Sequence, residues 1–385
     1  MPPCLPTSPP VSSQQNIRNS PPPPPAPAPR TRTMPIINKN IIATISILLL
    51  IIITIPSCKK SPAENTRESI NQTITIYCSV DQVYAEKLIA EFEKSHPDIT
   101  IQTRFDTETT KTTGLVQRLR TERANPQADL FWSSEIFQTI SLAHENILAS
   151  FDSPQVHDWP ETYRDKDRRW YAFAARARVI AYDPTRTTDP PTYWRDLADP
   201  KYKNRIAMAD PVFGTTRGHI ATWYTLWGKN ATNQFLHQLK QNNIRIVVSN
   251  SQAVRELLQH SVDFAITDTD DVHAANRNGN HLAIVYPRHG PNPHEGTLLI
   301  PNTLAFIAGR PQSPALRSFA EFILSEESER LLYQSDARNI PIIFKKEIAV
   351  DPALKVPDPL EVEYDVVAEN MNAAVKSAVQ ILNGK

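Results

Sequence analysis

The chain has 385 residues, long enough for two domains, and 40% of them are hydrophobic, as in ordinary globular proteins. Its 41 basic residues balance 41 acidic residues, so no net charge attracts nucleic acid or an anionic membrane. Only Cys4, Cys58 and Cys78 occur, which argues against a disulfide framework and a cysteine-rich metal site.

Residues 1–33 form a leader rich in Pro, Ser and Thr, with uninterrupted prolines from Pro21 to Pro25. Such a composition favours extended chain and cannot build a packed core. We expect this leader either to be disordered or to precede the true start of the protein at Met34, because a secretion signal behind it would be unusual.

Residues 34–57 have the pattern of a signal peptide: one positive charge, an apolar run from Ile41 to Ile55, and a small residue, Ser57. Ile55–Cys58 resembles a bacterial lipobox, which predicts that Cys58 is acylated and tethers the protein to a membrane. A plain N-terminal membrane anchor is the alternative. Either reading places the body outside the cytoplasm, in the periplasm or at the cell surface, behind a polar tether at 58–72.

Strands alternate with helices through the rest of the chain. In the first predicted helix, Ala85, Ile89 and Phe92 recur at the spacing of one helical face. The first predicted elements are the strands Thr73–Tyr77, Ile99–Phe105 and Ala128–Trp132, and the helices Gln82–Ser95 and Gly114–Arg123. This alternation predicts parallel βαβ units and an α/β fold.

The later elements continue the alternation. The predicted strands are Arg176–Asp183, Arg205–Ala209, Ile244–Val248, Asp263–Thr267, Leu282–Tyr286, Gly296–Ile300 and Leu304–Ala308. The predicted helices are Gly218–Leu226, Gln234–Gln241, Gln252–His260, Pro314–Leu324, Ser328–Tyr333 and Glu361–Leu382. We therefore expect one lobe from 73–181 and 287–385, and a second lobe, 182–286, inserted into it.

Three carboxylates, Asp268, Asp270 and Asp271, follow the predicted strand Asp263–Thr267. Open α/β sheets bind their ligands outside the carboxyl ends of their strands. Because neighbouring carboxylates repel one another unless a cation, a hydrogen-bond network or water offsets them, the segment is either a solvated turn or a site.

Four ordered motifs are similar to the periplasmic ferric-ion-type solute-binding proteins, the capture components of ABC importers. They are Tyr77–Ala85, Ala128–Glu135, Phe173–Val179 and Gly214–Thr216, and the resemblance covers most of 73–332. It implies a type II periplasmic-binding-protein clamshell, with two lobes, two crossover hinge segments and a ligand cleft that closes by hinge motion. It also implies a monomer that partners an ABC permease with its ATPase, with no organic cofactor and no enzymatic activity.

The resemblance assigns roles residue by residue. Asp81 and either Ser134 or Glu135 take the places of metal-facing side chains, Gly214–Thr216 the place of the cradle for a synergistic anion, and Asn250 and Asp268 the places of asparagines that assist the anion. The chain departs from the family at Asp270–Asp271, where the ferric binders carry adjacent tyrosines that hold Fe(III). This argues against iron itself and leaves the transport role intact.

The sharpest hypothesis for the site is a hard metal ion held by carboxylates, since Mg, Ca, Mn and ferric ions prefer oxygen donors. Two alternatives remain: Asp270 and Asp271 cap the following helix, or they hold a cationic or hydroxylated organic ligand. Arg176 either clamps an anion or fixes the hinge strand through an ion pair. The predicted metal ligands are Asp81, Glu135, Asp270 and Asp271, and the other predicted ligand-binding residues are Ser79, Thr112, Thr113, Ser133, Ser134, Arg176, Gly214, Thr215, Thr216, Asn250 and Asp268.

The leading function is an exported, lipid-tethered binding protein that hands a small solute to a permease, the solute being iron(III) or another hard metal ion with an anion, or an organic molecule. One alternative treats Asp268–Asp270 as the D-x-D motif of a metal-dependent transferase, although no G-x-S-x-G, H-E-x-x-H or Walker motif accompanies it. The other is a ligand-sensing binding protein for a membrane receptor.

Overall fold

The computed structural model describes residues 72–107, 110–343, 351 and 354–384. The predicted leader, signal peptide, tether and lipidation site Cys58 lie outside the described residues. Within the described ranges, no helix combines the length and apolar character needed to cross a bilayer.

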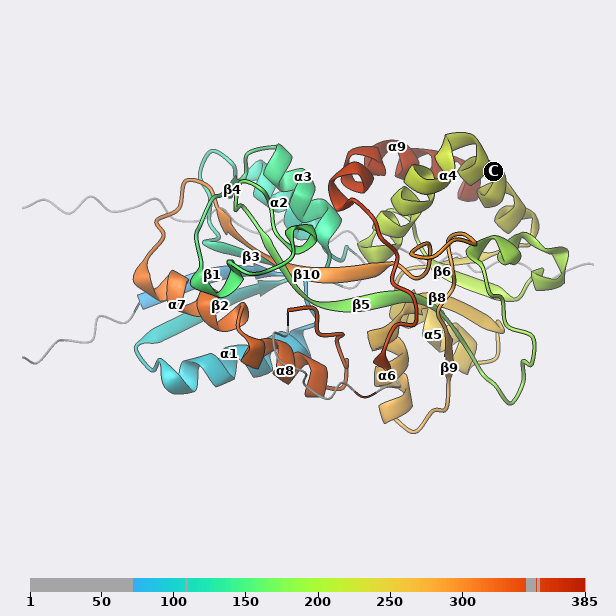
Figure 1. Cartoon of the computed structure of the whole chain (residues 1–385), viewed down its shortest axis with the longest axis horizontal. Coiled ribbons are helices and arrows are strands. Elements are labelled where there is room, and N and C mark those ends of the chain that lie inside the picture. The colour runs from blue at the N-terminus through green and yellow to red at the C-terminus, as the bar shows by residue number, and fades with distance from the viewer. Residues whose placement is uncertain (1–71, 108–109, 344–350, 352–353, 385) are drawn as a thin grey trace, which may run out of the picture. The chain divides into compact units, whose positions relative to one another are not determined.

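The elements alternate along the chain much as the sequence predicts (Figure 1). The strands are β1 (Gln72–Cys78), β2 (Ile99–Phe105), β3 (Leu130–Ser133), β4 (Leu148–Ala149), β5 (Tyr171–Tyr182), β6 (Ile206–Ala209), β7 (Arg245–Val247), β8 (Phe264–Asp268), β9 (Ala283–Val285) and β10 (Leu299–Ile307). The helices are α1 (Gln82–Ser95), α2 (Thr113–Thr121), α3 (Ile136–His144), α4 (Gly214–Gln241), α5 (Asn250–Leu258), α6 (Thr269–Arg277), α7 (Pro314–Ile323), α8 (Glu326–Gln334) and α9 (Tyr364–Leu382).

The strands join in the order β2-β1-β3-β10-β5-β8-β6-β7, with β4 paired to β10 and β9 to β5. β1, β2 and β3 are parallel, as are β6, β7 and β8, whereas β5 and β10 run antiparallel to their neighbours in this order. We call the part built on β2-β1-β3 the first lobe and the part built on β8-β6-β7 the second lobe. The strand β5 belongs to both, because residues 171–177 pair with β10 and residues 178–182 pair with β8.

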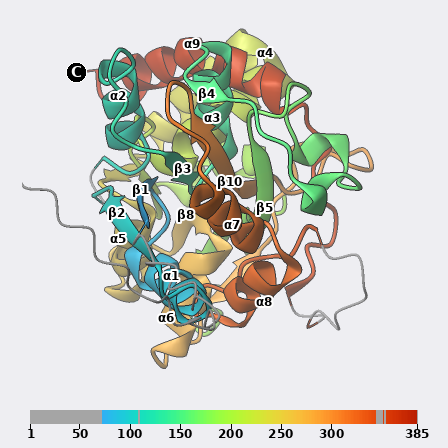
Figure 2. The same cartoon turned by 90° about the vertical axis from the view of Figure 1, so that its left-hand side faces the viewer.

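Helices cover both faces of this arrangement. Figures 1 and 2 show α2, α3, α4 and α9 on one face, and α1, α5, α6 and α8 on the other. On the first face one hydrophobic cluster runs through α3, α4 and α9, and includes Phe137, Trp223 and Met371. Because α9 packs against both α3 and α4, it contacts both lobes rather than only the first, to which its residues were assigned. The residue boundaries of the lobes stay a prediction.

The structure differs from the sequence prediction in several elements; β5, for example, begins at Tyr171 rather than at Arg176, and β4 was not predicted. The strands predicted around Pro301 are one strand, β10, which passes the proline at a shift in its register with β5. The helix α3 was not predicted, because seven of its nine residues are buried and its sequence lacks a polar face. The two helices predicted after Gly214 both form within α4, which is kinked between them by non-helical backbone at Gly228.

Both strands that connect the lobes are irregular at the same level. In β5, Ala174 has a φ of +44°, and β10 shifts register between Pro301 and Asn302. The buried carboxylate of Glu329, in α8, accepts hydrogen bonds from the backbone N–H of Ala174 at 2.8 Å and of Ile342 at 2.7 Å. The side-chain amide of Asn302 donates to the Ala174 carbonyl. These contacts fix the crossing point of the two lobes.

Candidate ligand cleft between the lobes

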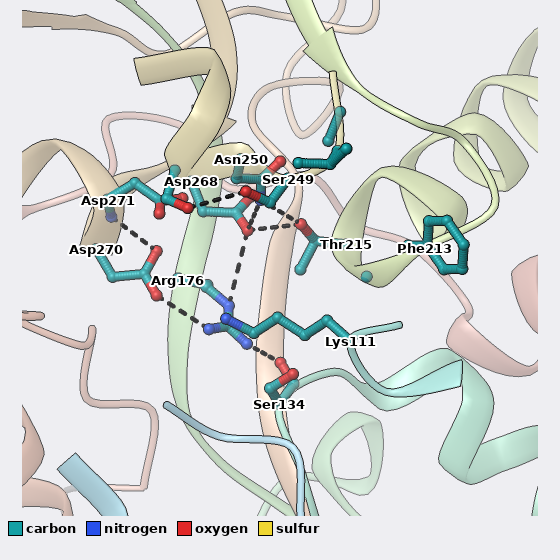
Figure 3. Close-up of a pocket in the computed structure, with 14 residues that line it drawn as sticks. Lys111, Ser134, Arg176, Phe213, Thr215, Ser249, Asn250, Asp268, Asp270 and Asp271 are labelled. Atoms are coloured by element: carbon teal, nitrogen blue, oxygen red, sulfur yellow. Dashed lines mark hydrogen bonds and ion pairs between the residues drawn. The ribbon is translucent and has the colours of Figure 1, made fainter. Parts of the chain in front are cut away.

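A cleft with about 480 Å³ of empty space lies where β6, β7 and β8 end, facing the loop after β3 (Figure 3). This is the edge where open α/β sheets bind ligands. The cleft is lined by Lys111, Ser134, Arg176, Ala209, Phe213, Gly214, Thr215, Val248, Ser249, Asn250, Ser251, Asp268, Asp270 and Asp271. At its rim, Val248 is 54% exposed. Lys111 and Ser134 belong to the first lobe, so both lobes contribute to the lining.

Three helices of the second lobe begin at the cleft: α4, α5 and α6. The amides in the first turn of a helix have no acceptor within that helix and favour negative charge. Phe213, the N-cap of α4, provides no side-chain acceptor, whereas the Ser249 hydroxyl at the N-cap of α5 accepts from the Gln252 amide at 3.2 Å. The helix α6 carries its own acidic residues, Asp270 and Asp271, in its first turn.

Asp268 is fully engaged by second-lobe groups. One of its oxygens accepts from Arg178 at 3.0 Å, and the other accepts from Thr215 at 2.6 Å and from Asn250 at 2.9 Å. Arg178 is completely buried and also donates from Nε to Nδ1 of His219 at 3.3 Å. Burial, together with the charge of Arg178, lowers the pKa of His219 well below its ordinary value, so the imidazole is neutral and accepts this bond. Asp268 is therefore a neutralised, fixed part of the cleft wall.

Arg176 lies at the centre of the cleft and connects the lobes (Figure 3). Its guanidinium donates to Asp270 at 3.0 Å in the second lobe and to the Ser134 carbonyl in the first. Its Nε is buried without a hydrogen-bond acceptor, 3.9 Å from the nearest Asp268 oxygen. Of its two predicted roles, anion clamp and ion-pair partner, the side chain has the second. Its Nε–H remains a donor without an acceptor.

Asp270 and Asp271 form the acidic side of the cleft. Together with Asp268 they present oxygens within 4.8 Å of one another. Burial raises the pKa of Asp270 against the opposing charge of Arg176, and burial next to Asp270 and Asp268 raises the pKa of Asp271 well above its ordinary value. Asp271 accepts from the Thr267 hydroxyl at 2.8 Å but has no ion-pair partner among the described residues.

The loop before α2 joins the two lobes across the cleft. The Lys111 carbonyl accepts from the Gly214 amide at 3.3 Å, and the Thr113 hydroxyl donates to the Val212 carbonyl at 3.4 Å. The ammonium group of Lys111 donates to Asp81, the N-cap residue of α1. Although burial alone would raise the pKa of Asp81, Lys111 holds it below its ordinary value. Asp81 is consequently paired within the first lobe.

The structure brings some of the predicted residues together and separates others. Those that line the cleft are Ser134, Arg176, Gly214, Thr215, Asn250, Asp268, Asp270 and Asp271. Those outside the lining are Ser79, Asp81, Thr112, Thr113, Ser133, Glu135 and Thr216. The hydroxyls of Ser79, Thr112 and Ser134 bond to one another inside the first lobe.

Glu135 does not join the acidic group, because its carboxylate caps α3. It accepts from the backbone N–H of Phe137 at 2.8 Å and of Gln138 at 3.1 Å, and it is 1% exposed. Burial raises its pKa to about 7. The cluster of acidic oxygens in the structure is therefore Asp268, Asp270 and Asp271, rather than the predicted set with Asp81 and Glu135.

Sequence reasoning missed Arg178, which anchors Asp268 from behind the cleft. The available signal was its alternation with Arg176 on an otherwise apolar strand, because a charge on a buried strand requires a partner. It also missed Phe213 and the serines on either side of Asn250, which line the cleft only because α4 and α5 begin side by side.

Comparisons with known proteins bear on the family and the fold of the chain. A family model described as bacterial extracellular solute-binding protein matches residues 125–364. A putative 2-aminoethylphosphonate-binding periplasmic protein of Salmonella typhi is 24% identical over 56% of this chain and 63% of its own length. Iron uptake protein A2 of Synechocystis sp. is 24% identical over 62% of this chain and 71% of its own length.

Among solved structures, iron-bound HitA from Pseudomonas aeruginosa matches with a TM-score of 0.70 and 22% identity, over 80% of this chain and 99% of that one. A match at this identity shows the fold. The chain has the α/β, two-lobed clamshell architecture of periplasmic binding proteins.

Proposed function

Because this chain belongs to the family of bacterial extracellular solute-binding proteins, we propose that it captures a small polar solute in the cleft between its lobes and delivers it to an ABC permease. The family match agrees with the resemblance found in the motifs. Its members bind solutes and are not enzymes, so the D-x-D transferase reading has no support. The observation that carries the proposal is a cleft at the strand ends, lined from both lobes by buried charged side chains.

The partners in this proposal are a membrane permease with its ATPase, and the protein acts as a monomer tethered through a lipid on Cys58. The extracellular family supports a location outside the cytoplasm. The lipid anchor is supported by the sequence Ile55–Cys58 alone. Metabolic labelling with a fatty acid tests it: a Cys58→Ala variant should lose the label and the membrane association together.

We propose that the solute carries a positive charge, which is received by the carboxylate of Asp271, a group without an ion-pair partner among the described residues. Replacing Asp270 and Asp271 together with alanine should abolish binding and leave the fold intact. The matched control replaces Glu326 and Glu327, which also open a helix as an adjacent acidic pair. Calorimetry and small-angle scattering should show solute-induced closure in the wild type and the control but not in the test variant. Unchanged affinity in that variant would refute the acidic site.

A hard metal ion, iron(III) among others, is the second candidate. The three carboxylates with oxygens within 4.8 Å favour it, and so do the relatives whose names record iron. Elemental analysis of protein purified without chelators tests it directly: about one equivalent of metal per chain supports the metal, and metal-free protein that still closes on an organic solute refutes it. No visible charge-transfer band is expected, because the cleft lining contains no tyrosine.

A further inference from the structure

We propose that the solute is a small zwitterion in which a short chain joins an ammonium group to an oxyanion group. The ammonium group binds at Asp270 and Asp271, and the oxyanion binds at Arg176 and the first turns of α4 and α5. This inference rests on the proposed function and names the chemical class of its solute.

Among the acidic groups in and beside the cleft, Asp271 has no basic partner in the described part of the chain. Asp268 is paired with Arg178, Asp270 with Arg176, and Asp81 with Lys111. Asp271 has only the Thr267 hydroxyl and no cation within ion-pair distance among the described residues. Asp271 is only partly buried, but it lies beside two other acidic groups without a counter-charge of its own, so a ligand that brings one positive charge is stabilised there.

The cation subsite suits an ammonium group better than a multivalent metal ion. A hard metal ion takes several free oxygens, whereas both Asp268 oxygens and one Asp270 oxygen already accept hydrogen bonds from side chains. The guanidinium of Arg176, 3.0 Å from Asp270, would also repel a metal ion. An ammonium group needs only acceptors for three N–H bonds. The carboxylate of Asp271 supplies them, together with the Asp270 oxygen that accepts only the Asp271 backbone N–H.

The other side of the cleft offers donors for an oxyanion. Arg176 is 5% exposed, lines the cleft, and has a buried Nε–H without an acceptor. The helix α4 begins at Gly214 without a side-chain cap. The Gly214 amide donates to the Lys111 carbonyl, so the next amides of the first turn, those of Thr215 and Thr216, are the ones that can meet a ligand, as at other anion-binding helix termini. Asp268 does not repel an oxyanion strongly, because Arg178 neutralises it. A guanidinium donor and a helix N-terminus together favour phosphonate, sulfonate or carboxylate oxygens.

The two subsites lie at different places along the cleft. Figure 3 shows Asp270 and Asp271 at the left, Asp268 between Asp271 and Thr215, Arg176 and Lys111 below the centre, and Phe213 at the right. A metal ion with a separate anion would place one positive and one negative group at the same two subsites as two unlinked ligands. The proposal differs from that alternative in the covalent link between the ammonium group and the oxyanion. A linked pair of groups binds more tightly than either group alone.

The experiment compares linked and unlinked charges on the full-length protein, freed of endogenous solute by unfolding and refolding. Calorimetry and scattering are run with 2-aminoethylphosphonate, taurine and β-alanine. Ethylphosphonate and ethylamine supply each half alone, and ferric citrate supplies the metal with an anion. At least one zwitterion should bind about 100-fold more tightly than either half and should close the lobes.

Two variants locate the ammonium group. Asp271→Asn should weaken zwitterion binding about 100-fold and leave ethylphosphonate binding unchanged or stronger, because the repelling carboxylate is gone. Asp271→Glu keeps the charge and should stay within about tenfold of the wild type. Glu327→Gln is the surface control, and circular dichroism shows that each variant is folded.

The outcomes separate this proposal from the proposed function. If ferric citrate or ethylphosphonate closes the lobes and no zwitterion does, the proposed class of solute is wrong, but the proposed function of solute capture is supported. If equal affinities are found for the wild type and Asp271→Asn, the ammonium subsite is wrong. If neither these probes nor a broad metabolite panel closes the protein, both proposals are wrong.

Discussion

Glu329 is a carboxyl group enclosed by the connection between the lobes, and it is fully buried. It accepts backbone N–H bonds from Ala174 in β5 and from Ile342 and Ile343 after α8. Burial raises its pKa from 4.5 to about 7, against the opposing effect of those hydrogen bonds. The crossing point therefore contains a titratable group that is protonated at mildly acidic pH.

This raised pKa predicts how stability depends on pH. The folded protein binds the Glu329 proton more tightly than the unfolded chain, so its contribution is complete below about pH 4.5 and is lost as pH rises through about 7. A shift of this size corresponds to roughly 3 kcal/mol. The difference in unfolding free energy between wild type and Glu329→Gln, measured in urea at pH 5 and pH 8, should change by up to that amount.

As pH rises, the unfolding free energy of Glu329→Gln should increase relative to that of the wild type, because glutamine is uncharged like the protonated acid. Glu327→Gln, a surface position on the same helix, should keep a constant difference from the wild type. A Glu329→Gln curve parallel to that of the wild type would contradict the assignment.

At the scale of residues, the sequence indicates which side chains gather at a strand end but not what they pair with. Asp268, Asp270 and Asp271 follow one strand, so their proximity is local and predictable. The partner of Asp268 is remote, because Arg178 precedes it by 90 residues. Periodicity carries no information about such long-range partners.

Among the elements, α3 and α4 approach each other closely at Gly218. A Cβ placed there would lie 2.1 Å from the ring of Phe137. Gly218→Ala should therefore destabilise the protein by about 1–3 kcal/mol, although alanine favours helices intrinsically. Thermal or urea unfolding measures the change.

A second substitution tests the cause. Phe137→Leu removes the ring that the new methyl group meets, so the double variant should recover part of the loss, giving a coupling energy of roughly 0.5–3 kcal/mol. Additive losses in the two single variants would show that the helices do not meet as described.

Amphipathic elements were predictable and uniformly buried ones were not. The bounds of α1 and β2 match the prediction at both ends. One face of each element is polar, so the regular spacing of the apolar residues can be recognised in the sequence. In α3 the polar residues Gln138 and Thr139 are buried with the apolar ones, so no period marks the helix. In β10, Pro301 looked like a strand end, but the register shift accommodates it.

For the molecule as a whole, contacts across the cleft favour the closed arrangement. Thr113 contributes one of them without lining the cleft. Thr113→Val should weaken solute binding about three- to tenfold, because losing the hydrogen bond of about 1 kcal/mol to Val212 disfavours closure. The bond that the Thr113 hydroxyl accepts from the Gln138 amide lies within the first lobe, so its loss should lower stability rather than affinity. Calorimetry with the captured solute measures the effect.

The control is Thr121→Val at the other end of α2, where the hydroxyl bonds only within the helix, to the carbonyl of Gln117. Its affinity should equal that of the wild type. Equal losses in the two variants would show that the bond from Thr113 does not couple to closure.

The two-lobed plan was predictable because alternating strands and helices and four short motifs identify it. The position of α9 was not. Its amphipathic pattern predicts a packed helix but does not say which lobe it covers, and the structure places it against helices of both.

The exposed rim residue Val248 is a suitable position for a fluorescent dye that reports solute binding. The cleft lining contains no tryptophan, so intrinsic fluorescence is a poor monitor of solute. A dye attached at Val248→Cys, in a chain whose Cys4 and Cys58 are replaced, would sit where water is displaced during capture. Cys78 would resist labelling, since it is fully buried and its pKa is raised by desolvation. The natural architecture thus provides the body of a reagentless biosensor, whose emission would change with solute concentration.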